Sequence, residues 1–186
     1  MIYWFEDCDI DGFTELDISG DDYKTLINHC YKYCKYFTFT SYKHTKNIVM
    51  NAPIKEKECR DHFWNPGRFG EVFIYECNQV NKDYLLTTVN SVFDWTNYGT
   101  PYSFPEDLTF YREDGSLFFY SEAHEGNCLL FPREAEDISL VLNQYGWRES
   151  ETLPECPFLT MPDKDYNLFA QKNYMPEKRY ECEKTS

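Results

Sequence analysis

The fold is decided by residues 107–131, which read DLTFYREDGSLFFYSEAHEGNCLLF. Runs rich in aromatic residues are typical of strands, and they alternate here with turn residues. The Asp114-Gly115 step is a strong hairpin signal, and Glu125-Gly126-Asn127 marks a second turn. The three strand-like runs cover residues 107–112, 116–121 and 128–131. We therefore predict a three-strand meander over about 107–131, which Pro132 ends.

Residues 19–36 give the clearest helical pattern. Ser19 with Asp22 resembles a capping box, and acids in the first turn suit the helix dipole. The apolar residues that share one helical face are Tyr23, Leu26, Ile27, Cys30, Tyr31 and Cys34. This spacing predicts a helix that packs on the sheet through that face.

Two further helices are expected on either side of the meander. Residues 82–96 have helical spacing, with Asn81 as a cap and Gly99 after the end, although their β-branched content also fits a strand. Residues 134–145 form an amphipathic pattern that ends before Gly146, a suitable residue just after a helix. Its inward side chains are expected to be Ile138, Val141, Leu142 and Tyr145.

The remaining segments complete an α+β fold with a mainly antiparallel sheet. Strands are expected at 36–42 and 71–77, with a hairpin neighbour at 47–51 and a short helix at Lys55–His62. We expect one globular domain over 1–147. Residues 148–186 carry four prolines and scattered aromatics, so an extended, partly packed tail is predicted there.

Composition excludes several classes of protein. The 186 residues carry a net charge of −14, and aromatic residues make up 19%. So many aromatics argue against disorder, and the acidity argues against binding nucleic acid or anionic lipid. A basic, aromatic stretch between Lys24 and Arg68 fits base stacking, but the acidic flanks oppose a polyanion.

The start of the chain lacks a secretory leader, and no stretch approaches the apolar length of a membrane span, so a cytoplasmic location is expected. The eight cysteines are then expected to be free thiols. Cys30 and Cys34 with His29 could begin a zinc site, but no second ligand pair completes it. Two small core residues are the favoured interpretation.

The charge is uneven along the chain. Residues 1–23 hold eight acids and no base, residues 24–69 carry +6, and residues 70–186 carry −12. An acidic segment with interleaved aromatics favours docking onto a basic protein, although acidity also serves solubility. The predicted partner-binding residues are Asp7, Asp9, Asp11, Glu15, Asp17, Trp4, Tyr98 and Tyr102.

Motifs for an active site are largely missing. The sequence has no phosphate loop, dinucleotide fingerprint, nucleophile elbow or zinc-protease motif. Cys59 and His62, three apart on the expected helix, are the best candidates for thiol chemistry. His124-Glu125 is interpreted as part of a solvated turn. We expect no catalytic residue, no metal and no cofactor.

The run over residues 107–131, with the small size, the acidity and the many Tyr and Phe residues, resembles small immunity proteins encoded beside bacterial polymorphic or contact-dependent toxins. That resemblance implies a cognate toxin, often a cationic nuclease, whose active site the protein occludes. Our leading hypothesis is a cytoplasmic acidic protein that neutralises a basic protein partner. The alternatives are a thiol-dependent enzyme using Cys59 and His62, and a non-enzymatic regulatory or structural domain.

Overall fold

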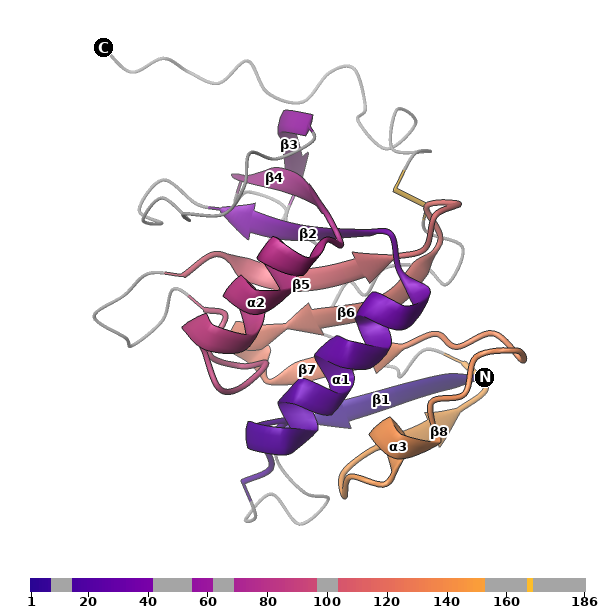
Figure 1. Cartoon of the computed structure of the whole chain (residues 1–186). Helices are drawn as coiled ribbons and strands as arrows, with labels where there is room; N and C mark the ends of the chain where they lie inside the picture. The colour runs from indigo at the N-terminus through magenta and orange to yellow at the C-terminus, as the bar shows by residue number, and fades with distance from the viewer. Residues whose placement is uncertain (8–14, 42–54, 62–68, 97–103, 153–166, 169–186) are drawn as a thin grey trace.

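The computed structural model describes residues 1–7, 15–41, 55–61, 69–96, 104–152 and 167–168, and these form an antiparallel sheet with helices on one side (Figure 1). Its strands are β1 (Ile2–Glu6), β2 (Tyr36–Ser41), β3 (Lys55–Asp61), β4 (Phe69–Glu76), β5 (Glu106–Tyr111), β6 (Leu117–Glu122), β7 (Asn127–Leu130) and β8 (Arg148–Ser150). The helices are α1 (Gly20–Tyr33), α2 (Gln79–Thr88), α3 (Ser139–Leu142) and the short 3-10 helix η1 (Ala123–Glu125). The predicted α+β class is confirmed.

The predicted meander is confirmed and forms the middle of the sheet. The strand order is β3-β4-β2-β5-β6-β7-β1-β8, with every neighbouring pair antiparallel. Gly115 has φ +80 in the first turn, a conformation that glycine adopts without strain. The first strand of the chain, β1, was not expected from the sequence, and it inserts between β7 and β8.

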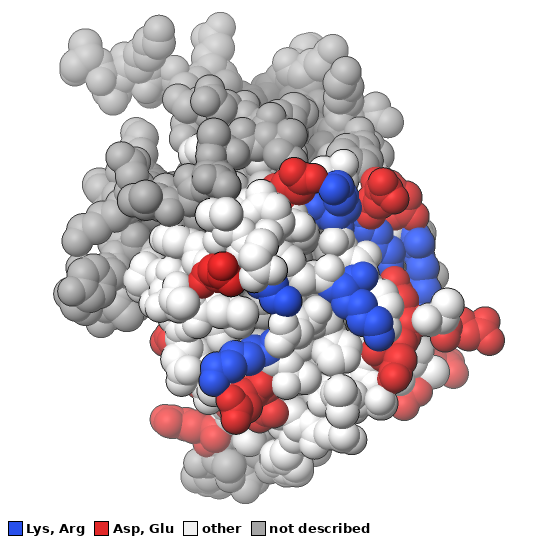
Figure 2. All heavy atoms as spheres, viewed as in Figure 1, with Lys and Arg blue, Asp and Glu red and all other residues white. Residues whose placement is uncertain are grey.

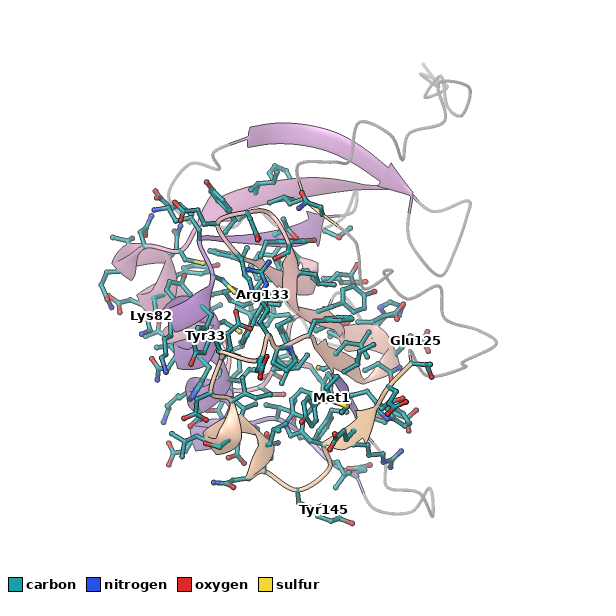
Figure 3. All side chains as sticks on the ribbon, turned by 90° about the vertical axis from the view of Figure 1, so that its right-hand side faces the viewer. Met1, Tyr33, Lys82, Glu125, Arg133 and Tyr145 are labelled. Carbon is teal, nitrogen blue, oxygen red and sulfur yellow. The ribbon has the colours of Figure 1, made fainter. Side chains whose placement is uncertain are left out.

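The helices cover one face of the sheet, with α1 lying across it and contacting α2, α3 and β6 (Figures 1 and 3). Four side chains of α1 are buried on the predicted face: Tyr23, Leu26, Ile27 and Cys30. They meet Phe5, Phe37 and Phe110 from the sheet in one core. Ser19 stands at the start of α1, but its side chain makes no capping hydrogen bond, so the predicted capping box is wrong.

A second, smaller hydrophobic core is formed by a different set of strand side chains. Tyr111, Tyr120 and Leu129 are buried there together with Ile2 and Leu168. The backbone N–H of Leu168 donates to the carbonyl of Gly115 at 2.8 Å. Leu168 falls in the expected tail, and β8 begins at the first residue of that tail, so parts of this segment belong to the packed fold.

Helix α2 begins three residues earlier and ends eight residues earlier than predicted. Its N-cap is Asn78 rather than Asn81, because the Asn78 side chain accepts a hydrogen bond from the Asn81 N–H at 3.0 Å. The helix ends where Val89 takes an extended conformation, which β-branched residues favour. Val92 and Trp95 lie beyond the end of the helix but are fully buried. The apolar pattern of this segment therefore reflects burial rather than a helix.

Helix α3 is four residues long, much shorter than the predicted 134–145. Glu136 is held by Arg112, so the residues ahead of α3 are fixed outside a helix. Ile138 and Val141 are buried as expected, whereas Tyr145 is 69% exposed. Gly146 has φ +111 and lies against the Phe5 ring, which leaves no room for a side chain.

The expected helix at 55–62 is wrong, since residues 55–61 form the edge strand β3. Alternating charges are typical of sheet edges, where they discourage pairing with other chains. Pairing with β4 overrides the weak helical signal of this polar run. The expected strand at 47–51 lies outside the described residues.

Candidate functional site

Exposed carboxylates from three separate segments meet at one end of the sheet, where β1 ends. The backbone N–H of Asp7 donates to the Gly126 carbonyl at 2.8 Å, and the Leu16 N–H donates to the Asp7 carbonyl at 2.6 Å. These bonds bring the neighbours of Leu16 and Gly126 next to Asp7. We call the exposed acids there the acidic end: Asp7, Glu15, Asp17 and Glu125.

The contact between Asp7 and Gly126 is close. A Cβ placed on Gly126 would lie 2.2 Å from the Asp7 carboxyl carbon, and Gly126 has φ +66. Glycine is therefore required here both by conformation and by space. Asp17 is held by two other hydrogen bonds. Its carboxylate accepts one from the Ser91 hydroxyl, and its backbone carbonyl accepts one from the Gln144 side-chain amide at 2.9 Å.

The structure places the predicted partner-binding residues unequally. Asp7, Glu15 and Asp17 lie together at the acidic end. Trp4 is half-buried on β1, and the Arg148 guanidinium covers its ring at 4.8 Å while donating to Glu6 at 3.0 Å. The other predicted members lie outside the described residues: Asp9, Asp11, Tyr98 and Tyr102.

The face that carries α1 and α2 has a different electrostatic character. Basic and acidic side chains are interspersed on it (Figure 2). Lys24 pairs with Asp21 at 2.8 Å, and Lys35 pairs with Glu76 at 2.6 Å. These two ion pairs neutralise carboxylates of the helical face.

Behind the acidic end lies a set of buried ionisable side chains that we call the buried cluster: Glu106, Asp107, Glu122 and His124. Glu106 is 0% exposed and Asp107 5%, and the His124 side chain is 4% exposed. Nδ1 of His124 lies 3.4 Å from a Glu106 carboxylate oxygen. Its Nε2 lies 3.5 Å from Glu125, which joins the buried cluster to the acidic end.

A bulge in β5 brings two consecutive carboxylates into this cluster. Thr38 pairs with Thr109 but Thr40 pairs with Glu106, so two residues of β5 lie opposite one residue of β2. Asp107 sits in this bulge with φ +59, alone among the described non-glycine residues in having positive φ. Such strained backbone is concentrated at functional sites. The bulge breaks the strand alternation that would send adjacent side chains to opposite faces.

Glu122 completes the cluster from β6. Burial, followed by the negative charges of Asp107, Glu125 and Glu106, raises the pKa of Glu122 to about 8. The carboxylate is 1% exposed, and water cannot stabilise its charge there. Removing it from solvent beside other acids therefore favours its protonated form or a cation nearby.

The interpretation of His124-Glu125 as a solvated turn is wrong for His124. The short helix η1 turns its side chain inward against Glu106, while Glu125 remains exposed. Figure 3 shows Glu125 on the side of the sheet away from α1 and α2. Neither the bulge nor this inward turn has a local sequence signal, so the buried cluster was missed from the sequence.

Four cysteines whose side chains the structure describes are buried or half-buried free thiols, as predicted. They are Cys30, Cys34, Cys77 and Cys128. Burial raises the pKa of each thiol, which removes the thiolate needed for nucleophilic chemistry. Cys59 lies on strand β3, where residues three apart do not share a face, so the helical argument for pairing it with His62 is lost. His62 itself lies outside the described residues.

Comparison with known proteins gives no relative. No family model, no curated protein and no solved structure matches this chain. Among the described helices none has the length and apolar character to cross a membrane.

Proposed function

We propose that this protein is a non-enzymatic binding protein that captures a basic protein partner on its acidic end. The cognate toxin implied by the resemblance to immunity proteins is the partner of choice, and capture would occlude the toxin's active site. The proposal is supported most directly by the convergence of exposed acids from the end of β1, the segment before α1 and the last residue of η1. Backbone hydrogen bonds bring these segments together although Glu125 lies more than 100 residues from the other three acids in the sequence.

A concentrated negative surface mainly raises the rate at which the protein associates with a basic partner. Electrostatic complementarity raises association rate constants from about 10⁵–10⁶ to as much as about 10⁸–10⁹ M⁻¹s⁻¹ at low salt. The Debye length is about 10 Å at 0.1 M salt, so carboxylates within one small surface act together on an approaching cation.

The backbone of this surface is preorganised. Asp7 is fixed by two backbone hydrogen bonds and by its contact with Gly126, and Asp17 is fixed through Ser91 and Gln144. Fixed charges lose less conformational freedom on binding than free ones. The surface is therefore suited to recognition as well as to solubility.

The test compares two fourfold variants that remove equal charge from different places. D7N/E15Q/D17N/E125Q neutralises the acidic end with side chains of similar shape. The matched control, E113Q/E134Q/E149Q/E151Q, neutralises four exposed acids elsewhere. The wild type and both variants are used as baits in cells of the source organism, and association kinetics with the captured protein are then measured at low and high salt.

We expect the wild type and the control to capture the same basic protein. The acidic-end variant should associate roughly tenfold or more slowly at low salt, with the difference shrinking as salt is added. An acidic partner, or equal association by the acidic-end and control variants, would refute the proposal.

A further inference from the structure

Three side chains of the buried cluster are arranged as the ligands of a single ion. One donor atom from each of Glu106, Asp107 and His124 lies within 4.8 Å of the other two. Metal–ligand distances are about 2.0–2.6 Å for cations bound by carboxylate oxygen and imidazole nitrogen, so ligands of one ion lie up to about 5 Å apart. The three donors therefore already span one coordination sphere.

Glu122 supplies a second, separate observation. It is 1% exposed, and its Oε1 atom has no hydrogen-bond partner within the part of the chain that the structure describes. Thr109 of β5 pairs with Tyr120 of β6, and the two strands are antiparallel. Two residues back along β5 and two residues on along β6, this register brings Asp107 beside Glu122. The negative charges of Asp107, Glu125 and Glu106 act on this carboxylate, so Glu122 lies beside the three donors.

The group is rich in buried carboxylates. Glu106, Asp107 and Glu122 have at most 5% exposure, and carboxylate oxygens are common ligands of divalent cations. The bulge at Asp107 is maintained although the left-handed conformation is unfavourable for aspartate. Replacing it by glycine would relax the backbone but would remove a donor.

We propose that Glu106, Asp107 and His124 bind one divalent cation beside the buried carboxylate of Glu122. Carboxylates suit Mn²⁺, Mg²⁺ and Ca²⁺, whereas imidazole suits Zn²⁺ and Fe²⁺, so a mixed set selects cations that accept both, such as Mn²⁺ or Zn²⁺. Glu125, at 3.5 Å from Nε2 of His124, orients the ring from outside, as carboxylates commonly do for metal-bound histidines. The ion would join the start of β5 to η1 and would lie behind the acidic end, which the site touches through Glu125.

The test uses Mn²⁺ as the probe, because its free form is counted by electron paramagnetic resonance and it binds thiols weakly. Protein stripped with EDTA is titrated with Mn²⁺ at neutral pH, and thermal unfolding is followed with and without the ion. We expect a single site. H124Q and E106Q should weaken it by at least roughly tenfold, and E125Q by about 10- to 100-fold, the usual effect of an orienting partner. H29Q is the matched control for a histidine outside the cluster.

D107G separates metal binding from folding. Glycine relieves the left-handed backbone, so the stripped variant should still fold while its Mn²⁺-induced stabilisation is lost. At an ion concentration of about 100 Kd the wild type should melt roughly 5–10 °C higher than without the ion. The proposal is overturned if stripped wild type binds no Mn²⁺, or if D107G and H124Q bind it as tightly as H29Q does.

Discussion

The Arg112 guanidinium holds the end of β5 to the chain that follows β7, and its removal provides the sharpest test of the packing. It donates to both Glu136 carboxylate oxygens, at 2.6 and 2.5 Å, and to the carbonyls of Leu117 and Phe131, at 2.5 and 2.7 Å. The side chains of Arg112 and Glu136 are 6% and 10% exposed. It also lies over the Phe118 ring at 5.1 Å.

Arg112→Met keeps most of the side-chain length and deletes the charge. Glu136 would then be a buried carboxylate without its partner, and two buried carbonyls would lose a donor. Breaking a buried pair from one side costs about 3–5 kcal/mol of the free energy of unfolding. For a chain of this size each kcal/mol lowers the melting temperature by about 2–4 °C, so a fall of roughly 6–20 °C is expected.

Arg133→Met is the matched control, because Arg133 pairs with Asp114 at 2.5 Å on the surface, where both side chains are more than half exposed. An exposed pair contributes about 0–1 kcal/mol. Urea unfolding of both variants gives their free energies of unfolding. An unchanged dependence of that free energy on urea concentration would show that the variants and the wild type expose similar surface on unfolding. Equal losses for Arg112→Met and Arg133→Met, or a loss below about 1 kcal/mol for Arg112→Met, would refute the reasoning.

Two predictions concern the buried cluster and the turn beside it. The raised pKa of Glu122, about 8 against an ordinary 4.5, means that the folded protein keeps a proton which the unfolded chain loses. Stability in EDTA should therefore fall as pH rises from 4.5 through 8, by up to about 5 kcal/mol at 1.4 kcal/mol per pKa unit. Glu122→Gln should flatten this decline in urea unfolding at several pH values, and parallel wild-type and variant profiles would contradict it. Gly126→Ala should cost more than Gly20→Ala, because both positions have positive φ but only the added Cβ at Gly126 would collide with a side chain, that of Asp7. We expect about 1 kcal/mol for the backbone strain at Gly20 and roughly 2–4 kcal/mol at Gly126 by the same denaturation assay, with equal costs contradicting the contact.

The elements that were predictable from the sequence are those stabilised by local signals. The Asp114-Gly115 turn and the apolar face from Tyr23 to Cys30 each lie within a short stretch, and the structure confirms both. Strand β3 was predicted as a helix because its own sequence carries no strand signal, and only its pairing with β4 makes it a strand. The end of α2 was misplaced because Val92 and Trp95 are buried without being helical.

The candidate site was predictable only in part. Asp7, Glu15 and Asp17 attracted attention as an acidic run, and they do share one end of the sheet. Glu125 joins them through a backbone hydrogen bond to its neighbour, which spacing along the chain does not reveal. The buried cluster depends on a register shift of one residue in β5, and a change that small leaves no mark on composition or periodicity.

The position of β1 has a consequence for how the protein is made. Its partners are β7 and β8, so residues 2–6 pair with residues near 130 and 150. A ribosome adds about 5–20 residues per second, so this strand waits roughly 6–30 s before both partners exist. Throughout that interval the nascent chain carries Phe5, which the finished fold buries completely, without the sheet that covers it. This edge of the sheet is therefore completed only late in translation, after residue 150 has been added.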